Sequence, residues 1–202
     1  MRSVALGLFL ALLCHAATKN VTVLVNFQKP HSNVSVTALR QELRDLLEPA
    51  GISVDVMLKS EMPPSPQFSE LVVFEMKGSC SMDAAPRTLP LASQEDRGPL
   101  GLAFSSNGEI LHFGEIECDR VRRCLQRVTG GDRPEKHQAE YGTALGIVVA
   151  HEIYHMIAGA KEHTKTGLTK ESLSAHELLD GVLTMPGVVR EALRRDVLLS
   201  AR

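Results

Sequence analysis

The sequence predicts an α+β protein, with strands and one helix in its first half and helices in its second half. Short runs of β-branched and alternating apolar residues, separated by turn residues, dominate up to residue 113, which is typical of strands. From residue 134 onward, apolar residues recur at helical spacing. The chain has 202 residues, 44% of them hydrophobic, which suits one ordinary domain and is too short for two large ones.

The first sixteen residues are similar to a secretory signal peptide. Arg2 precedes a short apolar run over residues 4–13, and Cys14 and Ala16 stand where a signal peptidase reads small residues. The run is too short to span a bilayer. We therefore expect residues 1–16 to be removed and residues 17–202 to form a single secreted or periplasmic domain with no integral membrane segment. A buried N-terminal helix is the alternative.

The first half predicts a strand, a helix and two further strands. The helix is expected at 35–48, with Ser35 as its cap and Gly51 at its end. Strands are expected at 21–25, 52–58 and 71–76, and three prolines within 61–67 require a loop.

A long loop and a β-hairpin are expected next. Residues 81–99 show no periodicity, and the segments 100–104 and 110–113 flank Asn107-Gly108, a dipeptide that favours tight hairpin turns. The helix that follows carries Arg120, Arg122, Arg123 and Arg127, which we expect to form a solvated face. An anion site is the alternative.

Three cysteines remain after the first sixteen residues. In an exported protein, the simplest oxidised state of Cys80, Cys118 and Cys124 is one disulfide and one thiol. Cys118 and Cys124 are six residues apart in a predicted helix, about 9 Å along its axis and on different sides, which is too far for a disulfide. We expect a Cys80–Cys118 bond. A Cys80–Cys124 bond and three reduced cysteines are the alternatives.

The charge balance argues against nucleic-acid binding. The chain has 22 basic and 24 acidic residues, with 4% aromatic residues and no tryptophan. It therefore has neither the basic character nor the aromatic platforms that nucleic-acid binders use.

The motif that most strongly indicates a metal site is His151-Glu152-x-x-His155, which lies late in the long predicted helix. Residues four apart project from one helical face, so both imidazoles can reach one metal ion. Glu152 then lies beside the metal, where its carboxylate can take a proton from a metal-bound water. The pattern predicts two zinc ligands and a catalytic base. Two histidines without a role on a helix are the alternative.

A catalytic zinc site needs a third protein ligand. Gly159 allows the helix to stop and the chain to reverse, because glycine tolerates a positive φ. This predicts His163 as the third ligand. Glu162, Glu171 and His176 are the competing candidates.

Together these residues resemble the zincin metallopeptidases, the metzincins above all, in which a glycine turn carries the chain to a third zinc-binding histidine. The intervals from His155 to Gly159 and His163 are longer here than in the metzincins. A closer similarity is to exported, metzincin-like proteins predicted in soil bacteria such as Acidobacteria, which also have a Cys-Asp-Arg helix start, here at Cys118. Their Gly-Ile-Met is replaced by Gly167-Leu168-Thr169. Met185-Pro186 is either a methionine turn or, more simply, a helix start.

The resemblance implies a zincin-like α+β fold, with a small, mixed, twisted sheet in residues 17–133 and a long active-site helix and C-terminal helices in 134–202. It implies one zinc ion on His151, His155 and His163, with Glu152 as the base. A peptide or protein substrate is expected to pair with an edge strand at 110–113. The implied function is an exported zinc-dependent metallopeptidase. The alternative is a non-catalytic, exported binding or interaction domain on the same scaffold.

Overall fold

The computed structural model describes residues 19–82, 98–126, 128, 134–181, 183–187 and 190–191. Its strands are β1 (Lys19–Phe27), β2 (Ile52–Leu58), β3 (Leu71–Lys77), β4 (Gly101–Ser106) and β5 (Glu109–Glu117). Its helices are α1 (Asn33–Leu47), α2 (Cys118–Gln126), α3 (Pro134–Ala158) and α4 (Ala175–Asp180), with short 3-10 turns at Glu48–Ala50 and Lys59–Glu61. The fold is α+β, as the sequence predicts.

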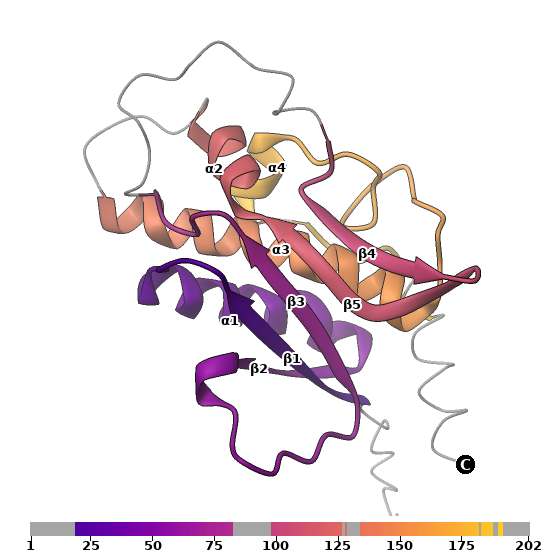
Figure 1. Cartoon of the computed structure of the whole chain (residues 1–202). Helices are drawn as coiled ribbons and strands as arrows, with labels where there is room; N and C mark the ends of the chain where they lie inside the picture. Colours follow the sequence, from indigo (N-terminus) through magenta and orange to yellow (C-terminus); the bar gives the residue numbers. More distant parts are fainter. Residues whose placement is uncertain are drawn as a thin grey trace, which may run out of the picture.

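The five strands form one mixed sheet in the order β2-β1-β3-β5-β4 (Figure 1). All neighbours pair in parallel except β4 and β5, which form the predicted antiparallel hairpin. Asn107 and Gly108 both have positive φ, 52° and 89°, as a tight hairpin turn of this kind requires.

The prediction of an edge strand at 110–113 is wrong. These residues belong to β5, which pairs with β3 on one side and with β4 on the other, so β4 forms the edge. Burial on the core-facing side of the sheet accounts for the strand order β3-β5-β4. Gly114 and Ile116 of β5 are buried and continue the core beyond Phe74 and Met76 of β3. The sequence indicates that two strands form a hairpin, but not which of them joins the sheet.

Helices α1 and α3 lie against each other and cover the same face of the sheet (Figure 1). Ser35 joins them, and the prediction that it caps α1 is wrong: α1 begins at Asn33, and Ser35 is buried inside it. Its hydroxyl lies 2.8 Å from the carbonyl oxygen of Gln138, to which it donates, and 2.9 Å from Oε1 of the same residue. A Cβ at Gly142 would lie 2.2 Å from the Ser35 carbonyl oxygen. The two helices are therefore closer here than a larger residue would allow.

A disulfide joins Cys80 to Cys118 at the start of α2, as expected, and Cys124 is outside it. The expectation of a solvated arginine face is wrong for Arg122, which is buried. Its guanidinium donates to the carbonyl of Ser79 at 2.9 Å and to the carboxylate of Asp119 at 2.5 Å. Arg122 thus supplies a donor to a partly buried backbone carbonyl beside Cys80.

The predicted signal peptide lies outside the described residues, as do residues 83–97 of the predicted loop. Within the described part of the chain, no helix has the length and apolar character needed to cross a membrane.

Candidate active site

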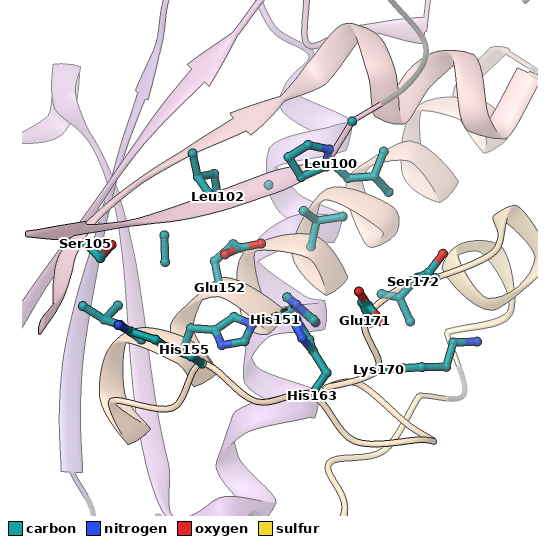
Figure 2. Close-up of a pocket in the computed structure, with 18 of the residues that line it drawn as sticks. Leu100, Leu102, Ser105, His151, Glu152, His155, His163, Lys170, Glu171 and Ser172 are labelled. Carbon is teal, nitrogen blue, oxygen red and sulfur yellow. Dashed lines mark hydrogen bonds between the residues drawn. The ribbon is translucent and has the colours of Figure 1, made fainter. Parts of the chain in front are cut away.

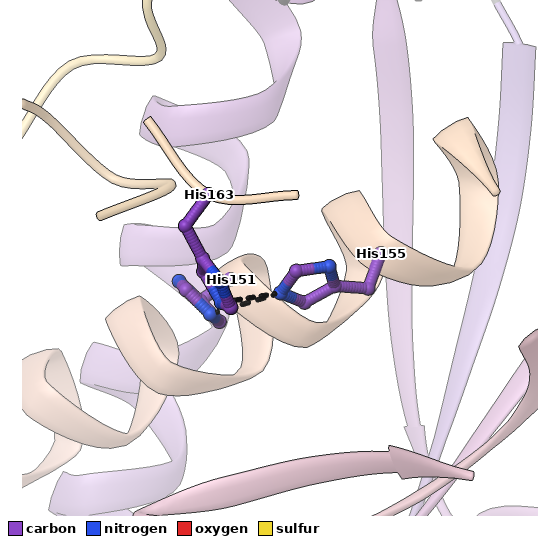
Figure 3. Close-up of side chains that lie close together, drawn as sticks. All are labelled: His151, His155 and His163. Atoms are coloured by element: carbon purple, nitrogen blue, oxygen red, sulfur yellow. Dashed lines mark hydrogen bonds between the residues drawn. The ribbon is translucent and has the colours of Figure 1, made fainter. Parts of the chain in front are cut away.

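Helix α3 and the turn after it bring three histidines together. His151 and His155 lie one turn apart on α3, which ends at Ala158. Gly159 follows with a φ of 57°, so the chain reverses where the sequence predicts, and it returns His163 to the same side of the helix (Figure 3). The ligand atoms of the three side chains lie within 4.8 Å of one another.

Two backbone carbonyls orient the rings on α3. Nδ1 of His151 lies 2.8 Å from the carbonyl oxygen of Leu168, and Nδ1 of His155 lies 2.6 Å from that of Ala160. A carbonyl oxygen only accepts hydrogen bonds, so in both neutral rings the proton is on Nδ1 and Nε2 keeps its lone pair. Carbonyl contacts of this kind are typical of metal-binding histidines.

The three Nε2 atoms suit a metal ion. His155 Nε2 lies 3.1 Å from His151 Nε2 and 3.2 Å from His163 Nε2. Tetrahedral zinc with bonds of about 2.1 Å holds its nitrogen ligands about 3.4 Å apart. Burial lowers the pKa of His151 to about 4, and burial also lowers the pKa of His155. Both rings are therefore neutral near pH 7, the state in which imidazole binds a metal ion.

The competing third ligands lie outside this histidine group. Of the described His, Cys, Asp and Glu residues, only His151, His155 and His163 form a group close enough to share one ion. Glu162 is not among them, and its backbone carbonyl accepts a hydrogen bond from Tyr154 at 3.3 Å. Glu171 lines the neighbouring cleft, whereas His176 does not.

Glu152 faces the same cleft and is held against the edge strand. A backbone hydrogen bond from Ala103 of β4 reaches its carboxylate. Burial nevertheless raises the pKa of Glu152 to about 7, with the Ala103 bond acting in the opposite direction. A carboxyl group with such a pKa can both accept and release a proton near neutral pH.

Gly101 makes this close approach feasible. A Cβ at position 101 would lie 2.9 Å from Cγ and Oε1 of Glu152 and 2.9 Å from Cγ1 of Val148. Sequence reasoning did not identify Gly101 or Ala103 as part of the site. Gly101 and Ala103 lie in a predicted strand, and no sequence motif marks them as site residues. Their position beside Glu152 results from the packing of β4 on α3, which the sequence does not reveal.

The site opens into a cleft of about 800 Å³ between β4, α3 and the chain after His163 (Figure 2). This volume is typical of a ligand-binding cavity. Apolar side chains line part of it, among them Leu100, Val148 and Leu173. The edge of β4 that pairs with no described strand forms one wall of the cleft from Gly101 to Ser105, with the Ala103 N–H directed to Glu152.

The segment around Met185 is connected to the histidine site through backbone bonds. Leu168, whose carbonyl contacts His151, donates its N–H to the carbonyl of Thr184 at 3.2 Å. Met185 is buried in the core. The carbonyl of Pro186 accepts the N–H of Arg190, which is the bond of a first helical turn and agrees with the simpler of the two expectations.

No family model and no curated protein matches the chain. Its fold is similar to the crystal structure of archaemetzincin from Methanopyrus kandleri, with a TM-score of 0.51 and 13% sequence identity over 93% of this chain and 99% of that chain. At this identity the similarity concerns the fold alone. The α+β arrangement of this chain is thus zincin-like, as the sequence resemblance implies.

Proposed function

We propose that the chain is a zinc-dependent metallopeptidase, with one zinc ion on His151, His155 and His163 and with Glu152 as its catalytic base. The observation that carries this proposal is the convergence of three imidazole Nε2 atoms beside a buried carboxyl group in one cleft. The archaemetzincin-like fold supports it. A site that only stabilised the fold would have no use for a base of raised pKa beside the metal ligands.

Glu152 would move the proton in this reaction. Zinc, when bound, supplies Lewis-acid polarisation of the scissile carbonyl and lowers the pKa of water. The Glu152 carboxylate would take the proton from the attacking water and give it to the nitrogen of the leaving amine. The Ala103 N–H holds this carboxylate in the cleft, and burial keeps its pKa close to the value that serves both steps.

The edge of β4 offers a backbone on which an extended substrate can lie. An extended peptide adds to an exposed sheet edge through main-chain hydrogen bonds. We infer that the substrate pairs antiparallel to β4, because antiparallel pairing is slightly more stable per residue. This assigns to β4 the substrate-binding role that the sequence suggested for residues 110–113.

The test replaces Glu152 with Gln and measures zinc content and peptide hydrolysis separately. Zinc should remain stoichiometric, because Glu152 is not a ligand, while hydrolysis falls by about a hundredfold or more, as expected for a lost general base. His155→Ala should lose the metal. Glu162→Gln is the matched control and should retain both properties.

Hydrolysis that survives Glu152→Gln would overturn the assignment of the base. Stoichiometric zinc in a wild-type protein that cleaves no peptide library would instead favour the non-catalytic binding domain.

We also propose that residues 1–16 are an export signal and that residues 17–202 form one secreted or periplasmic domain. The Cys80–Cys118 disulfide supports this proposal, since disulfides persist mainly in oxidising compartments. The mass of the secreted protein tests it, because retention of Met1 would contradict the proposal.

A further inference from the structure

The cleft has two different ends, which the packing of β4 on α3 defines. A Cβ at Gly101 would contact Val148 and Glu152, whereas Gly114, which pairs with Ala103, approaches Met156. Strand β4 therefore advances along α3 in the direction of the helix C-terminus. Glu152 lies between the two ends, with Leu100 on one side and Ser105 on the other (Figure 2).

We place Lys161 at the end of the cleft near Ser105, because it follows the turn after α3 and because β4 runs toward the C-terminus of that helix. Lys161 lines the cleft and directly follows Ala160, whose carbonyl contacts His155 at 2.6 Å. The carbonyl of Glu162, the residue after Lys161, accepts a hydrogen bond from Tyr154 of α3 at 3.3 Å. The backbone on both sides of Lys161 is thus fixed to the helix. Its side chain is exposed and makes no ion pair with any described residue.

The end near Leu100 carries an exposed acidic side chain, that of Glu171. Lys170 lines the cleft there, but its ammonium group lies 2.6 Å and 2.8 Å from the two carboxylate oxygens of Glu177, which neutralise it. Glu171 lies on the same side of Glu152 as Leu100 (Figure 2). It is exposed and has no cationic partner within the described part of the chain. Among the described lining residues, Glu171 is thus the exposed acidic side chain of this end, while Arg120 donates to the backbone carbonyl of Pro99 there.

We propose that this cleft selects extended peptides with an acidic side chain before the scissile bond and a basic side chain after it, through Lys161 and Glu171 respectively. The inference deepens the proposed peptidase function and rests on it. A substrate antiparallel to β4 has its N-terminal part near Ser105 and Lys161, and its C-terminal part near Leu100 and Glu171. Each substrate charge then meets a protein charge of opposite sign.

The size of the effect follows from the exposure of the two groups. Exposed ion pairs contribute about 0.2–1 kcal/mol each, which corresponds to about a 1.4-fold to fivefold preference. The fixed backbone around Lys161 reduces the entropy lost on pairing, so we expect the upper part of this range. Added salt should weaken the preference, because exposed charges are screened.

The experiment uses one neutral reference peptide and a set in which Asp or Lys replaces each residue from three before to three after the scissile bond. The wild-type protein should show a kcat/KM about fivefold higher for Asp than for Lys before the bond, and the opposite after it. Lys161→Glu should reverse the first preference and Glu171→Lys the second. Lys165→Glu and Glu135→Lys, exposed residues outside the cleft, are the matched controls and should change neither.

Binding of the same peptides to Glu152→Gln protein, measured by fluorescence anisotropy, separates this inference from the peptidase proposal. Charge preference in binding without hydrolysis by the wild type would refute the peptidase function and support the charge assignment. Hydrolysis with equal preferences in the wild type, Lys161→Glu and Glu171→Lys would overturn the charge assignment. An acidic preference after the scissile bond would overturn the substrate direction.

Discussion

The backbone of Gly101 lies against the carboxylate of Glu152, so closely that a Cβ at position 101 would be 2.9 Å from Oε1. Gly101→Ala should therefore displace Glu152 and lower kcat by about tenfold or more, since small errors in the position of a catalytic group are costly. Zinc content should not change. Gly187→Ala is the control, because a Cβ there has no neighbour within 4 Å and its φ is not positive. Unchanged kcat in Gly101→Ala would show that the carboxylate can move without loss.

The turn at Gly159 should control metal affinity. Its φ of 57° lies in the left-handed region, which costs a residue with a Cβ about 1 kcal/mol or more. Gly159→Ala should shift the chain that carries His163 and weaken zinc binding by about tenfold. Gly159→Asn should weaken it less, because Asn tolerates this conformation. Competition with a chromophoric chelator measures both affinities, and equal affinities for the two variants would contradict this explanation.

Glu42 should make the stability of the protein depend on pH. It lies half-buried on α1 near Gly146 and Gly181, and burial, followed by repulsion from Asp45, raises its pKa from 4.5 to about 7. Between these two pH values the folded state retains a proton that the unfolded state releases, so this group lowers stability as the pH rises through that interval.

Glu42→Gln should remove this effect. The full shift corresponds to about 3 kcal/mol, and solvent screening of the half-exposed carboxylate reduces the expected gain in unfolding free energy to about 1 kcal/mol at pH 8. No gain is expected at pH 4. Urea denaturation at the two pH values measures it, with Glu135→Gln as an exposed control. A gain of equal size at both pH values would rule out titration as the cause.

The disulfide should contribute strongly to stability. Cys80 and Cys118 are 38 residues apart, and closing a loop of this size in the unfolded chain is worth about 3–4 kcal/mol. Cys80→Ser should lower the free energy of unfolding by about this amount in chemical denaturation. Cys124→Ser, which leaves the bond intact, should have a much smaller effect. Equal losses in the two variants would show that thiol packing, and not the bond, is responsible.

Local patterns in the sequence predicted most elements of the fold. The segment 52–58, in which apolar residues recur at every second position, coincides with β2. Asn107-Gly108 forms the predicted hairpin turn. Helical spacing and one glycine were sufficient to anticipate that His151, His155 and His163 converge. In each case the determining information lies within about a dozen residues.

The errors concern relationships between distant segments. Ser35 has the chemistry of a cap, but its partner is Gln138, 103 residues away. Arg122 is not distinguished in sequence from Arg120 and Arg123, which are less buried, and its partner, the Ser79 carbonyl, is 43 residues away. The position of β4 at the sheet edge, and hence its contact with Glu152, likewise depends on which hairpin strand pairs with β3.

The enclosure of the β4 edge has a consequence for the proteins that this chain could attack. The edge lines the cleft together with α3 and the segment that carries Lys170 and Leu173. A strand that is already part of a folded sheet has its own neighbours attached and cannot enter such a space. Only a chain terminus, a long loop or an unfolded segment can. Under the proposed peptidase function, cleavage of a folded protein would thus be confined to its termini and long loops, and denaturation would open the rest of its chain to attack.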